Sequence, residues 1–236
     1  MQKNIQVCLT PALISLYDLS NSIVVVIDIF RATSSICYGI ENGAEAIIPV
    51  ATVDECRNYG RGCLLAAERD GKVVEGFDFG NSPFSYTAEK VAGKTIVLTT
   101  TNGTHAINES KKTAYQVIIG SFLNLDAVCD YLKAAQKDVV LLCAGWKNKF
   151  NLEDTLFAGA VVHQLKGEDY FLDDSSTAAE DLYLLAKDDL KAYTGKTSHS
   201  ERLKNLGIEK DIEFCLNVNT TQSIPVLKGD KLVRLG

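Results

Sequence analysis

Short apolar runs alternate with stretches of helical pattern along the first 150 residues. Six of these runs are predicted as strands: 23–29, which is apolar on both faces, 45–50, 63–68, and the candidate buried strands 95–100, 115–120 and 138–145. Start and stop signals between them predict helices from Ala32 to Asn42-Gly43, from Ser82 to Gly93, and from near Gly103 and Asn124. This alternation predicts an α/β protein of layered α/β/α architecture with a largely parallel, mixed central sheet.

The pattern changes after Asn151. Residues 152–166 and 175–190 are patterned as consecutive amphipathic helices with no strand between them, and residues 212–235 return to short strands with a turn at 228–230. We find no internal repeat and no flexible linker. We therefore expect residues 1–236 to form a single compact domain, with two lobes divided near residues 120–150 as the alternative.

Composition and charge narrow the class of protein. Of the 236 residues, 46% are hydrophobic and 23% are charged, as in ordinary globular proteins. The net charge is −6, and no run of Lys and Arg is interleaved with aromatics, so we expect no nucleic-acid partner. No segment approaches about twenty apolar residues, so we expect no membrane partner and a cytoplasmic protein. Seven cysteines without a CxxC pair indicate free thiols, with neither disulfides nor a structural metal.

Polar residues gather where the predicted strands end. Because the carboxyl ends of parallel strands open onto one crevice, we expect these groups to lie together. Each group alone has a simpler interpretation, as a helix cap, a tight turn or a first-turn acid. The groups are Asp28 with Arg31, Glu68 with Arg69, residues 100–104 (TTNGT), residues 143–145, and Glu153 with Asp154.

The combination of these groups suits a phosphorylated substrate and a hard divalent cation. Mg²⁺ binds one or two carboxylates together with substrate oxygens and water, and Asp28, Glu68, Glu153 and Asp154 are the candidate ligands. Backbone N–H groups after Asn102 could hold a phosphate, and Arg31 could neutralise charge in the transition state. The set indicates phosphoryl transfer to water.

Standard phosphatase signatures do not fit the chain. In "DIFRAT", Phe30 occupies the place of the second acid of aspartate-nucleophile phosphatases, and neither a cysteine-phosphatase loop nor a P-loop is present. For His105, His163 and His199 we favour structural roles, since none has a partner at ligand spacing. We expect Trp146 to cover the edge of the crevice.

Five ordered stretches carry a family resemblance: "VVVIDIFRATSSI", "AERDGKVVEGFDFGNSP", "LTTTNGT", "CAGWKNKFNLEDTLFAG" and "DIEFCLNVNTTQSIPVL". With them the chain resembles the 2-phosphosulfolactate phosphatases. The resemblance implies magnesium-dependent hydrolysis of 2-phospho-3-sulfolactate to 3-sulfolactate and inorganic phosphate, a step toward coenzyme M in methanogens and sulfolactate in some bacteria. By position it points to Asp28, Arg31, Glu68, Asn81, Ser82, Thr101, Asn102, Gly103, Glu153 and Asp154.

The sulfonate of such a substrate is a second fixed anion, for which Arg69 and Lys147 are the candidates. The nucleophile is left open between Asp28, through an acyl phosphate, and metal-activated water. Two alternatives also stay open: a phosphatase for another small phosphorylated acid, and a non-catalytic sensor of phosphorylated or sulfonated metabolites. A homodimer is the expected assembly.

Overall fold

A mixed sheet forms the centre of the computed structural model, which describes residues 3–60 and 62–236. Within these residues the sheet is 11-stranded, in the order β5-β4-β6-β3-β11-β10-β7-β2-β8-β1-β9. The strands are β1 (Lys3–Cys8), β2 (Ser22–Ile27), β3 (Ala46–Pro49), β4 (Leu64–Arg69), β5 (Lys72–Val73), β6 (Thr95–Thr99), β7 (Gln116–Gly120), β8 (Asp138–Cys143), β9 (Tyr170–Leu172), β10 (Pro225–Lys228) and β11 (Lys231–Arg234).

The sheet consists of two parallel sections joined by a hairpin. Strands β4, β6 and β3 pair in parallel, as do β7, β2, β8, β1 and β9. The hairpin β10–β11 lies between them and pairs antiparallel with β7 on one side and β3 on the other. The last strands of the chain therefore join the two sections.

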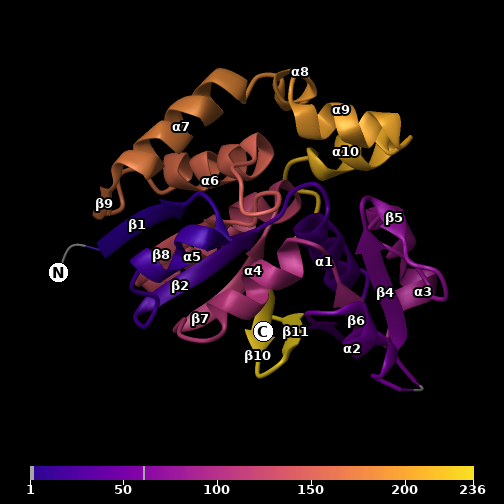
Figure 1. Cartoon of the computed structure of the whole chain (residues 1–236). Helices are drawn as coiled ribbons and strands as arrows, with labels where there is room; N and C mark the ends of the chain where they lie inside the picture. The colour runs from indigo at the N-terminus through magenta and orange to yellow at the C-terminus, as the bar shows by residue number, and fades with distance from the viewer. Residues whose placement is uncertain (1–2, 61) are drawn as a thin grey trace.

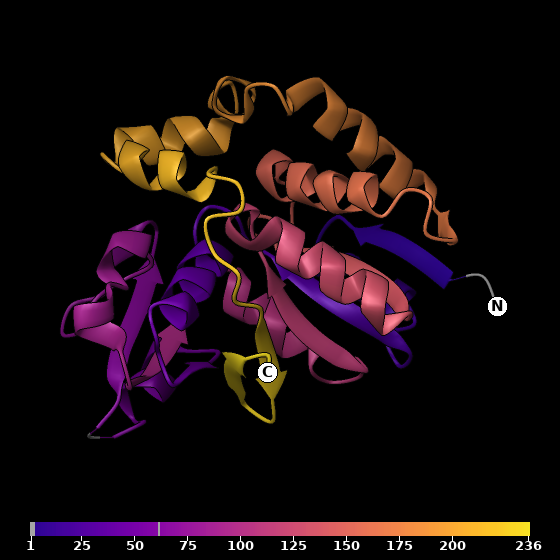
Figure 2. The same cartoon turned by 180° about the vertical axis from the view of Figure 1, so that it is seen from behind.

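The helices lie on both faces of this sheet. They are η1 (Pro11–Leu16), α1 (Ala32–Glu41), α2 (Val53–Arg57), η2 (Pro83–Ser85), α3 (Ala88–Val91), α4 (Gly103–Ser110), η3 (Phe122–Asn124), α5 (Leu125–Ala135), α6 (Leu152–Gln164), α7 (Asp174–Ala186), α8 (Leu190–Gly195), α9 (Ser198–Asn205) and α10 (Glu209–Cys215). Figures 1 and 2 show α7 to α10 as an arch, orange to yellow, above the sheet.

Alternating residues of β2 separate two layers of the core. Ile23, Val25 and Ile27 pack with the buried residues of α5 and α6, whereas Val24 and Val26 pack with those of α1 and α4. A strand buried on both faces needs no polar alternation, which is why its sequence is a continuous apolar run. The predicted layered α/β/α architecture with a largely parallel mixed sheet is confirmed.

Most predicted elements are present, but several predictions were wrong. Strands β1 and β9 were missed; β9, between α6 and α7, is a three-residue parallel partner of β1 and too short to give a pattern. Residues 212–215 belong to α10 rather than to a strand, since Asp211, Ile212 and Cys215 are buried at helical spacing. The segment after Ser82 forms η2 and α3 instead of one helix.

Candidate active site

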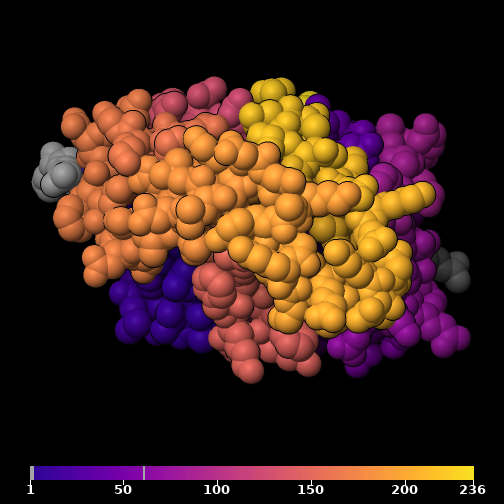
Figure 3. Space-filling view, turned by 90° about the horizontal axis from the view of Figure 1, so that it is seen from above, coloured from indigo at the N-terminus to yellow at the C-terminus, as the bar shows by residue number. Residues whose placement is uncertain are grey.

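A small cavity opens beyond the ends of β2, β4 and β6, beneath α9. Its volume is about 30 Å³, room for about two water molecules. Figure 3 shows α7 to α10, orange to yellow, spread over the face of the molecule seen from above. The cavity is lined by the predicted site residues Asp28, Arg31, Glu68, Asn81, Thr101 and Asn102, and by Thr100 of the predicted TTNGT group. The lining residues that were not predicted are Phe30, Asp70, Gly71, His199, Arg202 and Leu203. Trp146 also lines it.

Asp28 lies where two helices begin. Its backbone N–H donates to Thr33 Oγ1 at 3.1 Å and its carbonyl accepts from the Thr33 N–H at 3.0 Å, which fixes the first turn of α1. Gly103 opens α4 so close by that an added Cβ would lie 2.8 Å from Asp28 Oδ2. The glycine is therefore required sterically, and the positive ends of both helix dipoles lie near one carboxylate.

The pKa of Asp28 is raised from its usual value to about 7. Burial is the main cause; His199 counteracts it, while the nearby Glu68 and Glu153 raise the pKa further. An acid in this environment favours a cation beside it, because a positive charge compensates for the lost solvation.

Asp154 lies behind the cavity and does not line it. Its Oδ1 accepts from the Ile29 N–H at 2.9 Å and its Oδ2 from the Gly145 N–H at 3.0 Å. Burial, followed by Glu153 and Asp28, raises the pKa of Asp154 well above its usual value. Both oxygens are thus engaged in tying the loop after β2 to the loop after β8.

Glu153 is also behind the cavity, where it holds His199. Its Oε1 lies 2.5 Å from His199 Nδ1, and its Oε2 is buried with no hydrogen-bond partner among the described residues. The His199 ring contacts Phe30 edge to face, with ring centroids 5.9 Å apart. A structural role was favoured for His199 from sequence, but the side chain lines the cavity. His199 lies in the first turn of α9.

Arg31 is fixed from two sides. Its guanidinium donates to Asp211 Oδ2 at 2.5 Å and to the Gly71 carbonyl at 3.1 Å, and it is only 5% exposed. Ser82, which was expected to cap a helix, instead donates its hydroxyl to Asp211 Oδ1 at 3.0 Å. Asp211 thus orients Arg31 from α10. It is the first residue of the last of the five family-like stretches, but it was not predicted as a site residue.

The structure does not bring Arg69 and Lys147 to the cavity. The Arg69 guanidinium donates to the Glu68 carbonyl at 2.7 Å and to Thr99 Oγ1 at 3.0 Å. Lys147 donates its backbone N–H to Asn102 Oδ1, and its Nζ lies 4.7 Å from the centre of the Trp146 ring. Neither side chain lines the cavity.

Arg202, rather than Arg69 or Lys147, is a cation that reaches the cavity. It reaches the cavity from α9, with its guanidinium 4.8 Å from the centre of the Trp146 ring. In the part of the chain that the structure describes, Arg202 forms no ion pair. Its guanidinium therefore has no protein carboxylate paired with it among the described residues.

The carboxylates give an incomplete set of metal ligands. Among residues 3–60 and 62–236, no group of three or more His, Cys, Asp or Glu side chains is arranged to hold a metal ion. Asp28 and Glu68 face the cavity, and Glu68 also accepts a hydrogen bond from the Gly71 N–H. Two carboxylates face the cavity, and the unpartnered Glu153 Oε2 lies behind them. This set fits a Mg²⁺ ion whose other ligands are substrate oxygens and water, because Mg²⁺ is seldom held by protein groups alone.

Other sequence predictions concern the whole chain. All seven cysteines are free, as predicted. Within the described residues, none of the helices combines the length and apolar character needed to cross a membrane.

Comparisons with known proteins agree with the resemblance seen in the sequence. A family model described as 2-phosphosulpholactate phosphatase matches residues 8–230. A "Probable 2-phosphosulfolactate phosphatase" of Thermotoga petrophila is 45% identical, over 86% of this chain and 88% of that protein. Proteins of the same name are 44% identical in Caldanaerobacter subterraneus subsp. tengcongensis, over 90% of both chains, and 35% identical in Symbiobacterium thermophilum, over 92% of this chain and 96% of that protein. The chain therefore belongs to the 2-phosphosulpholactate phosphatase family, a family of phosphoric monoester hydrolases.

Proposed function

We propose that this protein is a magnesium-dependent phosphatase that hydrolyses 2-phospho-3-sulfolactate to 3-sulfolactate and inorganic phosphate. The names of its relatives supply the substrate. The observation that carries the proposal is the position of Asp28, buried at the starts of α1 and α4 and facing a cavity that also holds Arg31 and Glu68. Carboxylates, an oriented cation and helix N-termini are the groups that phosphoryl transfer needs.

In this proposal the phosphate lies between Arg31 and the first turn of α4. Arg31 donates to phosphate oxygens and stabilises the charge that develops on them, since Asp211 and the Gly71 carbonyl hold its guanidinium in place. At the start of α4 the Thr104 N–H is bonded to Thr100 Oγ1, and the Gly103 N–H binds another phosphate oxygen. Asn81 Oδ1, buried without a partner in the described residues, is a further polar atom at the cavity wall.

Asp28 and Glu68 would hold the Mg²⁺, with Glu153 behind them. When bound, the ion neutralises negative charge on the carboxylates and the phosphate. The reaction breaks the bond between phosphorus and the C2 oxygen of the substrate. Either Asp28 attacks phosphorus and water then hydrolyses the acyl phosphate, or water attacks directly. His199, held by Glu153, is placed to hydrogen-bond the departing oxygen.

We also propose that Arg202 binds the sulfonate. The phosphate and the sulfonate of the substrate need separate cationic contacts, and Arg31 already serves the phosphate. Among the described residues, Arg202 is the other arginine that lines the cavity, and its contact with Trp146 holds it beside the site. A single compact domain, the cytoplasmic location, a role toward coenzyme M, the lack of a nucleic-acid partner and the homodimer stay predictions from the sequence.

The test is phosphate release from racemic 2-phospho-3-sulfolactate, with Mg²⁺ and with EDTA. We expect release only with the metal, and a fall of about a hundredfold or more in Asp28→Asn, equivalent to about 2.7 kcal/mol of barrier. The control is Asp230→Asn, which alters an exposed pair with Lys111 and should be fully active.

Other outcomes point to the alternatives. Release only from phospholactate or phosphoglycerate would identify a phosphatase for another small acid, and no release from any of the three substrates would leave the metabolite sensor. Trapping a phosphoenzyme in the wild type would assign the nucleophile to Asp28.

A further inference from the structure

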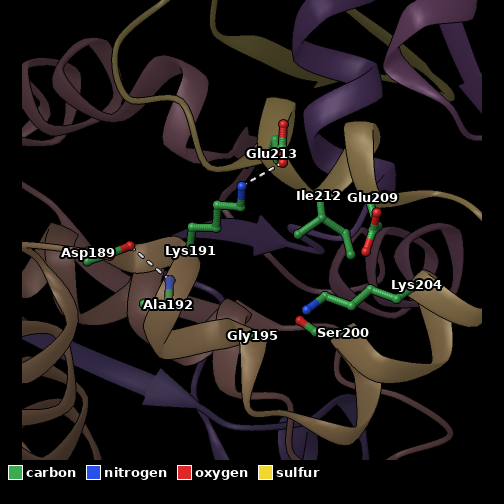
Figure 4. A pocket seen from close by; sticks show the side chains of 9 residues that line it. All are labelled: Asp189, Lys191, Ala192, Gly195, Ser200, Lys204, Glu209, Ile212 and Glu213. Carbon is green, nitrogen blue, oxygen red and sulfur yellow. Dashed lines mark hydrogen bonds and ion pairs between the residues drawn. The ribbon is translucent and has the colours of Figure 1, made fainter.

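A second and larger cavity lies among α8, α9 and α10 (Figure 4). Its volume is about 590 Å³, within the range of small-molecule sites. Ile212 and Ala192 give it an apolar wall, and Ser200, Lys204 and Glu209 give it polar groups. It is separate from the cavity that contains Asp28 and needs an explanation of its own.

Ser200 is the first indication of a binding site. Its side chain is fully buried, and its Oγ has no hydrogen-bond partner among the described residues. A buried hydroxyl without a partner costs about 1–3 kcal/mol, so such groups are rare unless a ligand or water satisfies them. Ser200 and Lys204, both on α9, are among the side chains that line the cavity in Figure 4, so a ligand in the cavity would meet both donors.

The charges around the cavity define the kind of ligand. Lys191 and Glu213 neutralise each other at 2.6 Å, and Asp189 accepts the Ala192 N–H at 2.8 Å. Lys204 and Glu209 form no ion pair or side-chain hydrogen bond within the described chain. Lys204 and Glu209 therefore offer a positive and a negative group at a cavity that is also lined by the apolar Ile212, which suits a molecule that carries both charges.

We propose that this cavity binds a small zwitterion of the size of an α-amino acid. The carboxylate of the ligand accepts hydrogen bonds from Lys204 Nζ and Ser200 Oγ, and its ammonium donates to Glu209. The side chain of the ligand packs on Ile212. This assignment accounts for the unpartnered hydroxyl and for both unpaired charges with one molecule.

The two cavities share helices, so binding at one affects the other. On α9, His199, Arg202 and Leu203 face the catalytic cavity, while Ser200 and Lys204 face the second one. On α10, Asp211 bonds Arg31, while Glu209 and Ile212 line the second cavity. A ligand that fits this arrangement stabilises it. Because α9 carries Arg202 and α10 carries Asp211, which bonds Arg31, binding of the zwitterion should change KM. This second step rests on the proposed function.

The binding test uses the twenty standard amino acids, each titrated calorimetrically into the whole protein. We expect at least one to bind with Kd below about 1 mM, and its decarboxylated and deaminated analogues to bind at least about tenfold more weakly. Lys204→Ala and Glu209→Gln should each weaken binding by a similar factor. The matched control is Lys210→Ala, an exposed lysine on α10 that does not line the cavity.

The outcomes test binding, coupling and the proposed function separately. If no amino acid binds, or if Lys204→Ala and Lys210→Ala bind equally well, the site is not a zwitterion site. If the ligand binds but leaves KM unchanged in an active enzyme, the coupling is wrong. If the protein binds an amino acid but hydrolyses none of the phosphate esters, the proposed function fails and the binding site stands.

Discussion

At the scale of single residues, Asp211 connects the arch of helices to the catalytic cavity. Its two oxygens contact Arg31 and Ser82, and all three groups are shielded from water to a large extent. Because an ion pair shielded in this way is only weakly screened, the orientation of Arg31 depends on it. We therefore regard Asp211 as a positioning residue.

Asp211→Asn should lower kcat by about tenfold or more and leave KM less affected, since Arg31 loses its charged partner but remains in the cavity. We also expect a loss of about 3 kcal/mol in the free energy of unfolding, because the Arg31 charge is left unpaired. Steady-state kinetics and urea unfolding measure the two effects. Asp211→Glu should recover part of kcat, and an Asn variant with wild-type kcat would contradict the positioning role.

Arg202 provides a separate prediction on specificity. Arg202→Ala should reduce kcat/KM for 2-phospho-3-sulfolactate by at least about tenfold, because the sulfonate loses a charge-assisted contact. Activity on 2-phospholactate, which has no sulfonate, should change little. Lys147→Ala is the control, since Lys147 does not line the cavity. Equal losses of kcat/KM on both substrates would show that Arg202 does not bind the sulfonate.

At the scale of elements, α6 and α7 pack unusually closely at Gly159. A Cβ at this position would lie 2.0 Å from the Ala179 carbonyl oxygen. Helix α6 is also buried along almost its whole length, including Glu153 and Asp154. The expectation of an amphipathic helix was wrong here, because the sheet covers one side of α6 and α7 the other.

Gly159→Ala should therefore destabilise the protein by about 1–3 kcal/mol, since the two backbones must separate to accept a methyl group. Thermal and urea unfolding test this. Gly195→Ala is the matched control, because the nearest atom to the new methyl group is 3.9 Å away. Equal stability of the two variants would show that the α6–α7 contact is easily displaced.

Elements could be predicted from the sequence where the residues that specify them lie close together in the chain. Strand β2 and helix α1 could be predicted because a buried apolar run and an Asn-Gly stop lie within a few residues. Asp28 and Glu68 could be predicted as neighbours because strand ends meet at one edge. His199, Arg202 and Asp211 could not, because α9 and α10 reach the cavity only through the tertiary arch, which leaves no periodic signal in the sequence.

At the scale of the whole molecule, Glu41 holds the final segment of the chain. One oxygen of this last residue of α1 accepts hydrogen bonds from the backbone N–H of Gln222, the N–H and hydroxyl of Ser223, and the Arg234 guanidinium. Burial acts to raise the pKa of Glu41, but these donors outweigh it and leave the pKa below its usual value. The hairpin β10–β11 follows directly, so Glu41 helps to fix it between the two sections.

Glu41→Gln should lower the free energy of unfolding by about 1–2 kcal/mol at pH 7. Because the folded pKa is lowered, the stabilisation by Glu41 is present above the pKa of the unfolded chain and is lost as pH falls through the folded pKa. The difference between wild type and variant should therefore shrink below about pH 4. Urea unfolding at pH 7 and pH 3.5 measures it. Glu75→Gln, at an exposed position, should show no such difference.

The position of the hairpin has a consequence for synthesis on the ribosome. Residues 225–234 are translated after every other strand, yet they lie between β3 and β7. A nascent chain therefore carries two separate sheet sections with open inner edges until these residues leave the exit tunnel. Open edges are templates for pairing with other chains. We expect nascent chains stalled before residue 225 to need chaperone protection, and completed chains to lose that need as the hairpin inserts.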